Sequence, residues 1–305
     1  MAPPPSRPLR IGTRGSPLAL AQARMVADAL FAAHGWDEAA VEIVPITTTG
    51  DVIKDRPLAE YGGKALWTKE LDRCLAEGRT DLSVHSMKDV ETIRPAALLI
   101  AAMLPRADTR DRLIGAETLD SLPEGARVGT SSPRRTAQLL ARRPDLRCVP
   151  IRGNVQTRLA KVESGEFDAT LLAAAGLARL GIKAGTPLDL LPAPAQAAIG
   201  VEIRAEDSGL RETLAAIDHR PTHACVSAER EFLLKLGGDC HSAVAAEARH
   251  SGDEIWLEAE ILMPDGSEVQ RLQMDLYGED CAFPGDVARI LLDRASPALR
   301  AMFAP

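Results

Sequence analysis

One strand–turn–helix motif occurs twice in this chain, and it limits the possible folds more than any other feature of the sequence. The first copy is Ile11-Gly-Thr-Arg-Gly-Ser-Pro17, and the second is Val128-Gly-Thr-Ser-Ser-Pro133. In both copies a short apolar strand and a Gly-Thr turn precede Ser-Pro, the usual combination of an N-cap residue with proline in the first helical turn. The repeat predicts that two similar α/β domains each begin with this motif.

The residues around the two copies predict alternating strands and helices. The first domain is expected to have strands at 9–12, 41–46 and 81–85, and helices at 18–31 and 67–76. The second is expected to have strands at 127–130, 147–151 and 169–173, a helix at 134–142 and another after residue 154. This alternation indicates two doubly wound α/β domains whose parallel sheets are covered on both faces. A strand expected at 199–203 comes late enough to return to the first domain.

The last third of the chain has a different pattern. Thr222 is expected to cap a helix that ends at Leu236-Gly237-Gly238. Three strands at 243–249, 255–262 and 268–276 are separated by turn signals, and a helix starts near Asp286. This pattern predicts a small α+β domain with an antiparallel meander. The expected bounds are 8–104 plus 195–218 for domain 1, 105–194 for domain 2 and 219–305 for domain 3.

Composition and charge argue against several classes of function. The net charge is −7 and only 3% of the residues are aromatic. Nucleic acid and anionic membranes are therefore not expected as partners, because both need a basic surface. The longest apolar run, 96–104, is too short to span a bilayer. The proline-rich first eight residues do not resemble a signal peptide. We expect a cytoplasmic protein and, since nothing suggests otherwise, a monomer.

No metal or nucleotide site is predicted. The five cysteines are odd in number and scattered, with no CxxC pair, and the histidines form no cluster with ligand spacing. No stretch fits the GxGxxG or Walker pattern.

Arginines gather where an anion would be useful. Arg14, Arg134 and Arg135 lie at or beside the two predicted helix N-termini. A cation there opposes the helix dipole unless an anion is present, although a single arginine at such a position commonly just reaches solvent. Arg152 and Arg158 lie near the end of another strand, where open α/β sheets bind ligands. Several arginines together predict a ligand with several carboxylates.

Two other features have both an ordinary and a functional interpretation. Lys88-Asp89 follows a strand, so it is either a solvated charged pair or an acid–base group. Cys240 follows Gly237-Gly-Asp239 in a loop and is either an incidental exposed thiol or an attachment point. The chemistry of the residues favours the incidental thiol.

Taken in order along the chain, these segments resemble the hydroxymethylbilane synthase family, also called porphobilinogen deaminase. The resemblance covers nearly the whole chain after residue 8. It rests on Arg10-Ile-Gly-Thr-Arg-Gly-Ser-Pro-Leu-Ala-Leu20, Gly62-Gly-Lys64, Lys69-Glu-Leu71, His85-Ser-Met-Lys-Asp89, Gly129-Thr-Ser-Ser132, Arg134-Arg135, Arg152-Gly-Asn154 and Ala175-Gly-Leu177.

The resemblance implies a transferase of heme and other tetrapyrrole biosynthesis. Members of this family join four porphobilinogen molecules head to tail, release ammonia and hydrolyse off linear hydroxymethylbilane. Their primer is a dipyrromethane cofactor bound by a thioether to a loop cysteine, which aligns with Cys240. The implied fold has two domains like the lobes of periplasmic binding proteins and a third α+β domain that carries the cysteine.

The resemblance also implies roles for individual residues. Asp89 is the catalytic carboxylate, which binds pyrrole N–H groups and stabilises the cation left when ammonia departs, and Lys88 assists it. The residues implied to hold the cofactor are Cys240, Lys88, Asp89, Ser86, Thr130, Ser132, Arg134, Arg135 and Arg152. Those implied to hold the substrate are Arg14, Ser16, Arg152, Arg158, Arg179 and Gln196.

Several positions depart from the family pattern. Ala195-Gln-Ala197 replaces the usual Gly-Gln-Gly, which is expected to stiffen that segment. Glu60 stands where a lysine is common, which removes one possible contact to a carboxylate. The main alternative function is a non-catalytic cytosolic binding protein for a small polycarboxylate, in which Lys88, Asp89 and Cys240 have no role.

Overall fold

A computed structural model of the chain describes residues 1–48, 68–239, 241–252, 254–277 and 282–303. The chain forms two compact units, which are described separately below. Unit 1 is Met1–Ala107 with Ala198–His223, and unit 2 is Asp108–Ala197 with Ala224–Pro305. No helix in the described ranges is both long enough and apolar enough to cross a bilayer.

Unit 1 is built on a five-stranded sheet with the strand order β2-β1-β3-β10-β4. Strand β1 pairs in parallel with β2 and β3, whereas β10 is antiparallel to both β3 and β4. The elements are β1 (Leu9–Arg14), α1 (Pro17–His34), β2 (Val41–Ile46), α3 (Lys69–Ala76), β3 (Leu82–Ser86), β4 (Leu98–Met103), β10 (Ile199–Arg204) and α7 (Ser208–Leu214). The late strand thus returns to the first sheet, as the sequence predicted.

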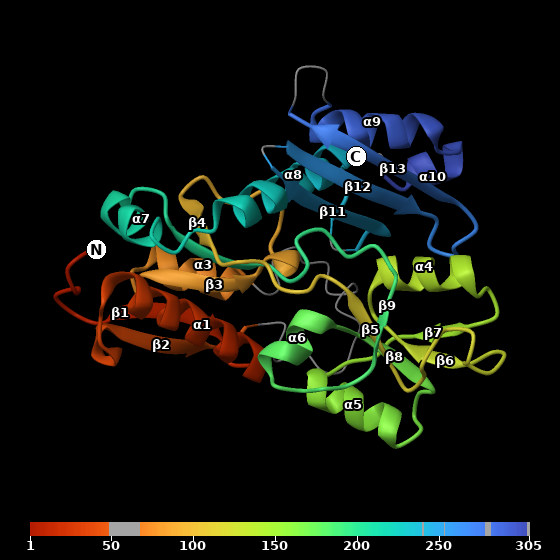
Figure 1. The fold of residues 1–305 in the computed structure, drawn as a ribbon, viewed down its shortest axis with the longest axis horizontal. Coiled ribbons are helices and arrows are strands. Elements are labelled where there is room, and N and C mark those ends of the chain that lie inside the picture. The colour runs from red at the N-terminus through yellow and green to blue at the C-terminus, as the bar shows by residue number, and fades with distance from the viewer. Residues whose placement is uncertain (49–67, 240, 253, 278–281, 304–305) are drawn as a thin grey trace. The chain divides into compact units, whose positions relative to one another are not determined.

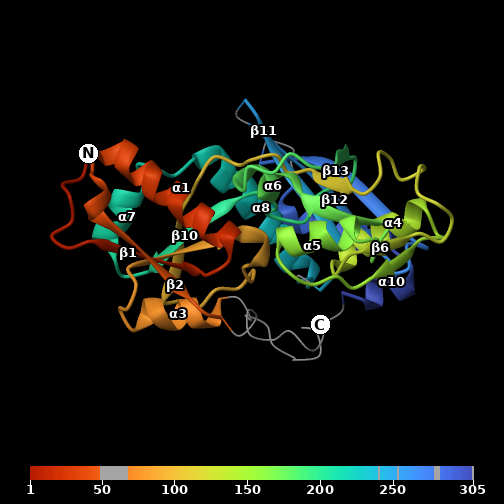
Figure 2. The same cartoon turned by 90° about the horizontal axis from the view of Figure 1, so that it is seen from below.

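The two faces of this sheet are covered by different helices, and Figure 2 shows α1 and α3 on opposite sides of β1 and β2. Ile11 and Val84 share one buried cluster with Val26 of α1. Because neighbouring residues of a strand point to opposite faces, His85 lies on the face of α3. Burial of each aliphatic side chain of this cluster contributes about 1.5–3 kcal/mol to the stability of the fold. This packing holds the ends of β1 and β3 in place.

Unit 2 contains a second five-stranded sheet, with the order β7-β6-β8-β5-β9. Its elements are β5 (Asp111–Ile114), β6 (Arg127–Gly129), α4 (Pro133–Arg142), β7 (Arg147–Val149), α5 (Val155–Glu163), β8 (Ala169–Ala173), α6 (Ala174–Arg179) and β9 (Thr186–Leu188). Strand β6 is parallel to β7 and β8, but β5 is antiparallel to β8 and β9.

The prediction of parallel sheets was therefore wrong in part, because both α/β sheets are mixed. The antiparallel strands β10 and β5 come from segments that do not follow the simple strand–helix alternation. Strands β4, β5 and β9 were not predicted, since short apolar runs have no distinctive periodicity.

The rest of unit 2 is the antiparallel meander that the sequence predicted, with the order β11-β12-β13. Its elements are α8 (Arg220–Leu236), β11 (Val244–Ser251), β12 (Glu254–Leu262), β13 (Val269–Leu276), α9 (Pro284–Arg294) and α10 (Pro297–Ala301), and α8 begins in unit 1. Figure 1 shows α9 beside β13. A buried cluster that includes Phe232, Leu257 and Leu291 joins the sheet to α8 and α9.

Thr222 was predicted to cap α8 but lies inside its first turn. The helix begins at Arg220, because the fixed φ of Pro221 suits a first helical turn. His219 takes over part of the capping, since its Nδ1 accepts from the backbone N–H of Thr222 at 3.3 Å. The predicted fold class is confirmed, with two doubly wound α/β sheets and a small C-terminal antiparallel domain. The exact bounds of the three expected domains stay a prediction.

Candidate functional site

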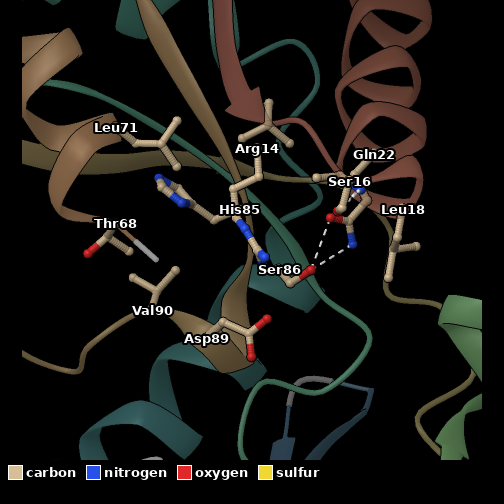
Figure 3. Close-up of a pocket in the computed structure, with 12 residues that line it drawn as sticks. Arg14, Ser16, Leu18, Gln22, Thr68, Leu71, His85, Ser86, Asp89 and Val90 are labelled. Carbon is tan, nitrogen blue, oxygen red and sulfur yellow. Dashed lines mark hydrogen bonds between the residues drawn. The ribbon is translucent and has the colours of Figure 1, made fainter. Parts of the chain in front are cut away.

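A pocket in unit 1 lies where the carboxyl ends of β1 and β3 meet the N-terminus of α1. Its lining includes Arg14 from the end of β1, Ser16 from the start of α1, and Ser86 and Asp89 from the end of β3 (Figure 3). Parallel strands place their carboxyl ends at the same edge of a sheet, where α/β proteins commonly bind ligands. The structure thus brings together four residues that the sequence predicted as ligand contacts.

Two hydroxyl groups of this pocket are fixed by local hydrogen bonds. Ser16 caps α1, since its side chain accepts from the backbone N–H of Ala19 at 3.3 Å. Ser86 and Gln22 exchange two hydrogen bonds, of 2.8 and 3.0 Å. Gln22 is 2% exposed and was not predicted, because one glutamine in an apolar helix has no distinctive spacing. These bonds hold Ser16 and Ser86 in place before any ligand arrives.

Asp89 ends a short 3-10 turn, Met87–Asp89, that continues β3. Met87 is 1% exposed and packs against Gly200 of β10, where a side chain would clash with the methionine sulfur. The turn is therefore anchored by a buried residue, while Lys88 is half-buried and Asp89 is exposed. This arrangement presents a carboxylate to the pocket on a fixed backbone.

The second copy of the motif forms the N-terminus of α4 in unit 2. Ser132 caps this helix by accepting from the backbone N–H of Arg135 at 3.4 Å. Thr130 supports the cap, since its Oγ1 accepts from the Ser132 N–H at 3.2 Å. The predicted helix starts at Ser16-Pro17 and Ser132-Pro133 are both confirmed.

The two arginines of this copy are buried against an acidic residue that was not predicted. Arg134 and Arg135 both bind the Asp111 carboxylate, with shortest distances of 2.8 and 2.7 Å. Burial alone would raise the pKa of Asp111. The charges of Arg135 and Arg134 outweigh this effect and hold the pKa well below its usual range. The protein itself therefore supplies the anion expected beside these arginines, and their predicted contact with the cofactor stays a prediction.

Gln196 belongs to the same buried group. Its side chain is 1% exposed and donates to the Thr109 carbonyl at 2.6 Å and to Asp111 Oδ1 at 3.0 Å. The residues on both sides of it, Ala195 and Ala197, have φ values of 62° and 70°. This left-handed backbone favours glycine, which explains why the family pattern has glycine at these two positions.

The other predicted arginines of unit 2 lie on separate elements. Arg152 is half-buried after β7. Arg158 is half-buried on α5 and donates from Nε to the Gly153 carbonyl at 3.0 Å. Asn154 caps that helix by accepting from the Thr157 N–H at 2.9 Å. The predicted cofactor cysteine, Cys240, and Glu60 lie outside the described residues.

Arg179 differs from the buried arginines because it forms no salt bridge with any described carboxylate. It donates from Nη2 to the Ala197 carbonyl, and its buried Nε has no hydrogen-bond partner among the residues that the structure describes. Burial lowers the pKa of Arg179 to about 10, so the guanidinium stays charged at neutral pH. A charged group that is partly desolvated and lacks an acidic partner is well suited to bind a carboxylate.

Comparisons with known proteins identify the family. The family model described as "Porphobilinogen deaminase, dipyromethane cofactor binding domain" matches residues 9–212. The model described as "Porphobilinogen deaminase, C-terminal domain" matches residues 223–291. The chain belongs to the porphobilinogen deaminase family. The family resemblance predicted from the sequence motifs is confirmed, and with it the transferase activity of tetrapyrrole synthesis.

Two relatives within the porphobilinogen deaminase family are similar over nearly their whole length. The porphobilinogen deaminase of Sphingopyxis alaskensis is 55% identical over 311 residues, covering 98% of each chain. The porphobilinogen deaminase of Paracoccus denitrificans is 53% identical over 301 residues, covering 96% of each chain. Among solved structures, a periplasmic substrate-binding protein of an ABC transporter from Coxiella burnetii matches with a TM-score of 0.43 and 16% identity. That match covers 73% of this chain and 96% of the other.

Proposed function

We propose that Asp89 is the catalytic carboxylate of the deaminase reaction and that Cys240 carries the dipyrromethane primer. The placement of Asp89 supports the first part most directly. Asp89 lines the same pocket as Arg14 and Ser86 at the edge of the sheet, and the buried Met87 fixes its backbone. A fixed carboxylate of this kind can stabilise positive charge in a transition state without having to reorganise.

The described residues fit a ligand such as dipyrromethane that bears several carboxylates. Within the described part of the chain, the buried Nε atoms of Arg179 and Arg134 lack hydrogen-bond partners, so each has a donor left for an acidic ligand. Arg179 also lacks a salt bridge to the described acidic residues. Ser16 and Thr130 add hydroxyl groups at the two copies of the repeated motif.

In this proposal the residues of the pocket bind, orient and stabilise. The dipyrromethane group, when bound to Cys240, supplies the pyrrole carbon onto which the first substrate unit is added. Arg14 and Ser16 bind carboxylates of porphobilinogen at the N-terminus of α1, where the helix dipole adds to their attraction. Asp89 accepts a hydrogen bond from the pyrrole N–H and stabilises the cation that remains on the substrate when ammonia leaves. Lys88 contributes a positive charge to the turn that carries Asp89.

The remaining ligand contacts are proposed on the family pattern and on the positions of the side chains. The primer would be held by Arg134, Arg135, Arg152, Ser86, Thr130 and Ser132. The growing chain would be held by Arg152, Arg158, Arg179 and Gln196. Gln196 acts through Asp111 in this proposal, because its amide is already committed to that carboxylate. We further propose that the enzyme is a cytoplasmic monomer that binds neither nucleic acid nor membranes.

Intact-mass spectrometry of the purified chain tests the attachment. The wild-type chain and Cys148→Ser should both carry a mass increment equal to dipyrromethane, because the half-buried Cys148 is a different free thiol. Cys240→Ser should have its bare sequence mass and no activity. A wild-type chain at its bare mass that still binds polycarboxylates would instead support the non-catalytic binding protein.

A further inference from the structure

A buried group of charged residues in unit 1, separate from the pocket contacts above, is centred on Arg94. Its guanidinium donates to Glu202 of β10 at 2.8 and 2.9 Å, to Glu91 at 2.7 Å and to Asp72 of α3 at 2.6 Å. The Arg94 side chain is 9% exposed and that of Glu202 is fully buried. One arginine therefore joins three carboxylates from a loop, a helix and a strand.

This Arg94 cluster extends to two residues that line the pocket. Glu202 Oε2 is 3.1 Å from Nε2 of His85, the residue before Ser86 on β3. Glu91 accepts from the Thr68 hydroxyl at 3.0 Å. His85 and Thr68 both line the pocket, as does Asp89 (Figure 3). The cluster thus reaches the pocket wall through two hydrogen-bonded paths.

The cluster also holds both sides of the segment that carries Asp89. On the side before Asp89, His85 is joined to Glu202. On the side after it, Glu91 and Arg94 are joined to Thr68, Asp72 and Glu202. Asp89 itself is exposed, so its position depends on these neighbouring anchors and on the buried Met87. Burial alone would raise the pKa of Glu202. Hydrogen bonds from His85 and Arg94 outweigh burial and lower this pKa to about 2, so the Glu202 carboxylate stays charged.

We propose that Arg94 is a positioning residue for catalysis, which holds the turn bearing Asp89 by joining Glu91 and Glu202. This inference rests on the proposed role of Asp89. Arg94 does not act on the substrate in this account. Its effect is geometric, because a displacement of about 1 Å at a reacting group can lower a rate by about 100-fold.

The kinetic test uses holoenzyme with porphobilinogen as substrate. Arg94→Lys keeps the charge but not the planar fork, and should lower kcat by about tenfold while changing KM by less than about twofold. The double variant Arg94→Met/Glu202→Gln removes both charges of the fully buried pair, and the carboxylates of Asp72 and Glu91, which also lose Arg94, are 19% and 22% exposed and keep contact with water. It should fold and should have a kcat lower by about 10- to 100-fold. Arg10→Met breaks an ion pair with the buried Asp81 in the same unit and serves as the matched control, with kcat unchanged.

A second measurement does not depend on the cofactor. Hydrogen exchange followed by mass spectrometry in the Cys240→Ser background should show faster exchange in residues 86–91 for Arg94→Lys. The strands β1 and β2 should exchange as before. Wild-type kcat for both Arg94 variants, or faster exchange across all of unit 1, would overturn the positioning role. If Asp89→Asn retained its turnover, the proposed function itself would fail, which is a separate result.

Discussion

Arg135 holds Asp111 by two hydrogen bonds, from Nη2 to Oδ1 at 2.7 Å and from Nε to Oδ2 at 3.1 Å. The geometry is the bidentate arrangement in which arginine binds a carboxylate most strongly. Arg134 binds the same carboxylate from the preceding position of α4. Asp111 therefore fixes the side chains of two adjacent residues at the helix end that opens the second copy of the repeated motif.

Asp111→Asn should destabilise unit 2 strongly. The substitution leaves two buried guanidinium groups without their anion, and breaking a buried pair in this way typically costs about 3–5 kcal/mol. Urea unfolding measures the loss. Asp108→Asn is the matched control, because Asp108 pairs with Arg110 at the surface and should change stability by less than about 1 kcal/mol. Equal effects of the two substitutions would contradict the structural importance of Asp111.

Arg179→Met should separate function from stability. The wild-type guanidinium is partly buried and pairs with no acidic residue in the described ranges, so its removal also removes a desolvation cost. The free energy of unfolding should therefore change by less than about 1 kcal/mol, since the bond to the Ala197 carbonyl is the hydrogen bond that Arg179 makes to the described residues. Activity with porphobilinogen should fall at least about tenfold, because a charge-assisted bond to a carboxylate is worth about 1.5–3 kcal/mol. Unchanged kcat/KM would remove Arg179 from the ligand contacts.

The two copies of the repeated motif show how much of this site local sequence can predict. Ser16-Pro17 and Ser132-Pro133 mark their helices correctly, because capping depends only on neighbouring residues. Asp111 could not be predicted, since it reaches Arg134 from a strand 23 residues away through antiparallel pairing. Local periodicity contains no information on which strands pair.

The same reason applies to the Arg94 cluster in unit 1. Arg94 lies in a loop just before Pro95, where the sequence alone indicates an ordinary surface charge. Glu202 lies 108 residues further along the chain. Only the return of β10 to the first sheet brings them together. The family motifs identified Asp89, but not the residues that hold it.

The stability of unit 1 should depend on the ionisation of Glu202. Its pKa falls from the ordinary 4.5 to about 2, so the folded chain binds fewer protons than the unfolded chain in mild acid. The resulting stabilisation, up to about 3 kcal/mol, is complete above roughly pH 4.5 and is lost as the pH falls towards 2. Asp72 offsets part of this pH-dependent stabilisation, because burial raises the pKa of Asp72.

Urea unfolding from about pH 3 to pH 7 checks the sign of this effect. Glu202→Gln should be less stable than wild type at neutral pH and should lose less stability on acidification. Glu206→Gln is the control, since Glu206 is exposed in the same unit and its substitution should leave the pH profile unchanged. Parallel profiles for wild type and Glu202→Gln would show that Glu202 is not the linked group.

Ala195→Gly and Ala197→Gly should be nearly neutral, although both alanines are buried. Their left-handed backbone costs about 1–2 kcal/mol for a residue with a Cβ, and glycine removes that cost. The gain is offset by the loss of a buried methyl group, about 0.8 kcal/mol, and by the greater entropy of glycine in the unfolded chain. Ala198→Gly, at the buried position after Ala197, gains nothing and should cost about 1–2 kcal/mol. Thermal unfolding of the three variants distinguishes them, and a uniform cost would mean that the left-handed backbone is not strained.

Asp89→Asn should retain the fold and lose nearly all turnover. The side chain is exposed and its backbone belongs to an anchored 3-10 turn, so the amide should fit without loss of stability. An amide cannot stabilise the cation that forms as ammonia leaves, and removal of one such electrostatic group lowers kcat by about 100- to 1,000-fold. Rates of ammonia release and unfolding curves, measured together, separate the two effects. Asp89→Glu keeps the charge on a longer side chain and should recover part of the rate. Turnover of the asparagine variant within about tenfold of wild type would assign the chemistry to another group.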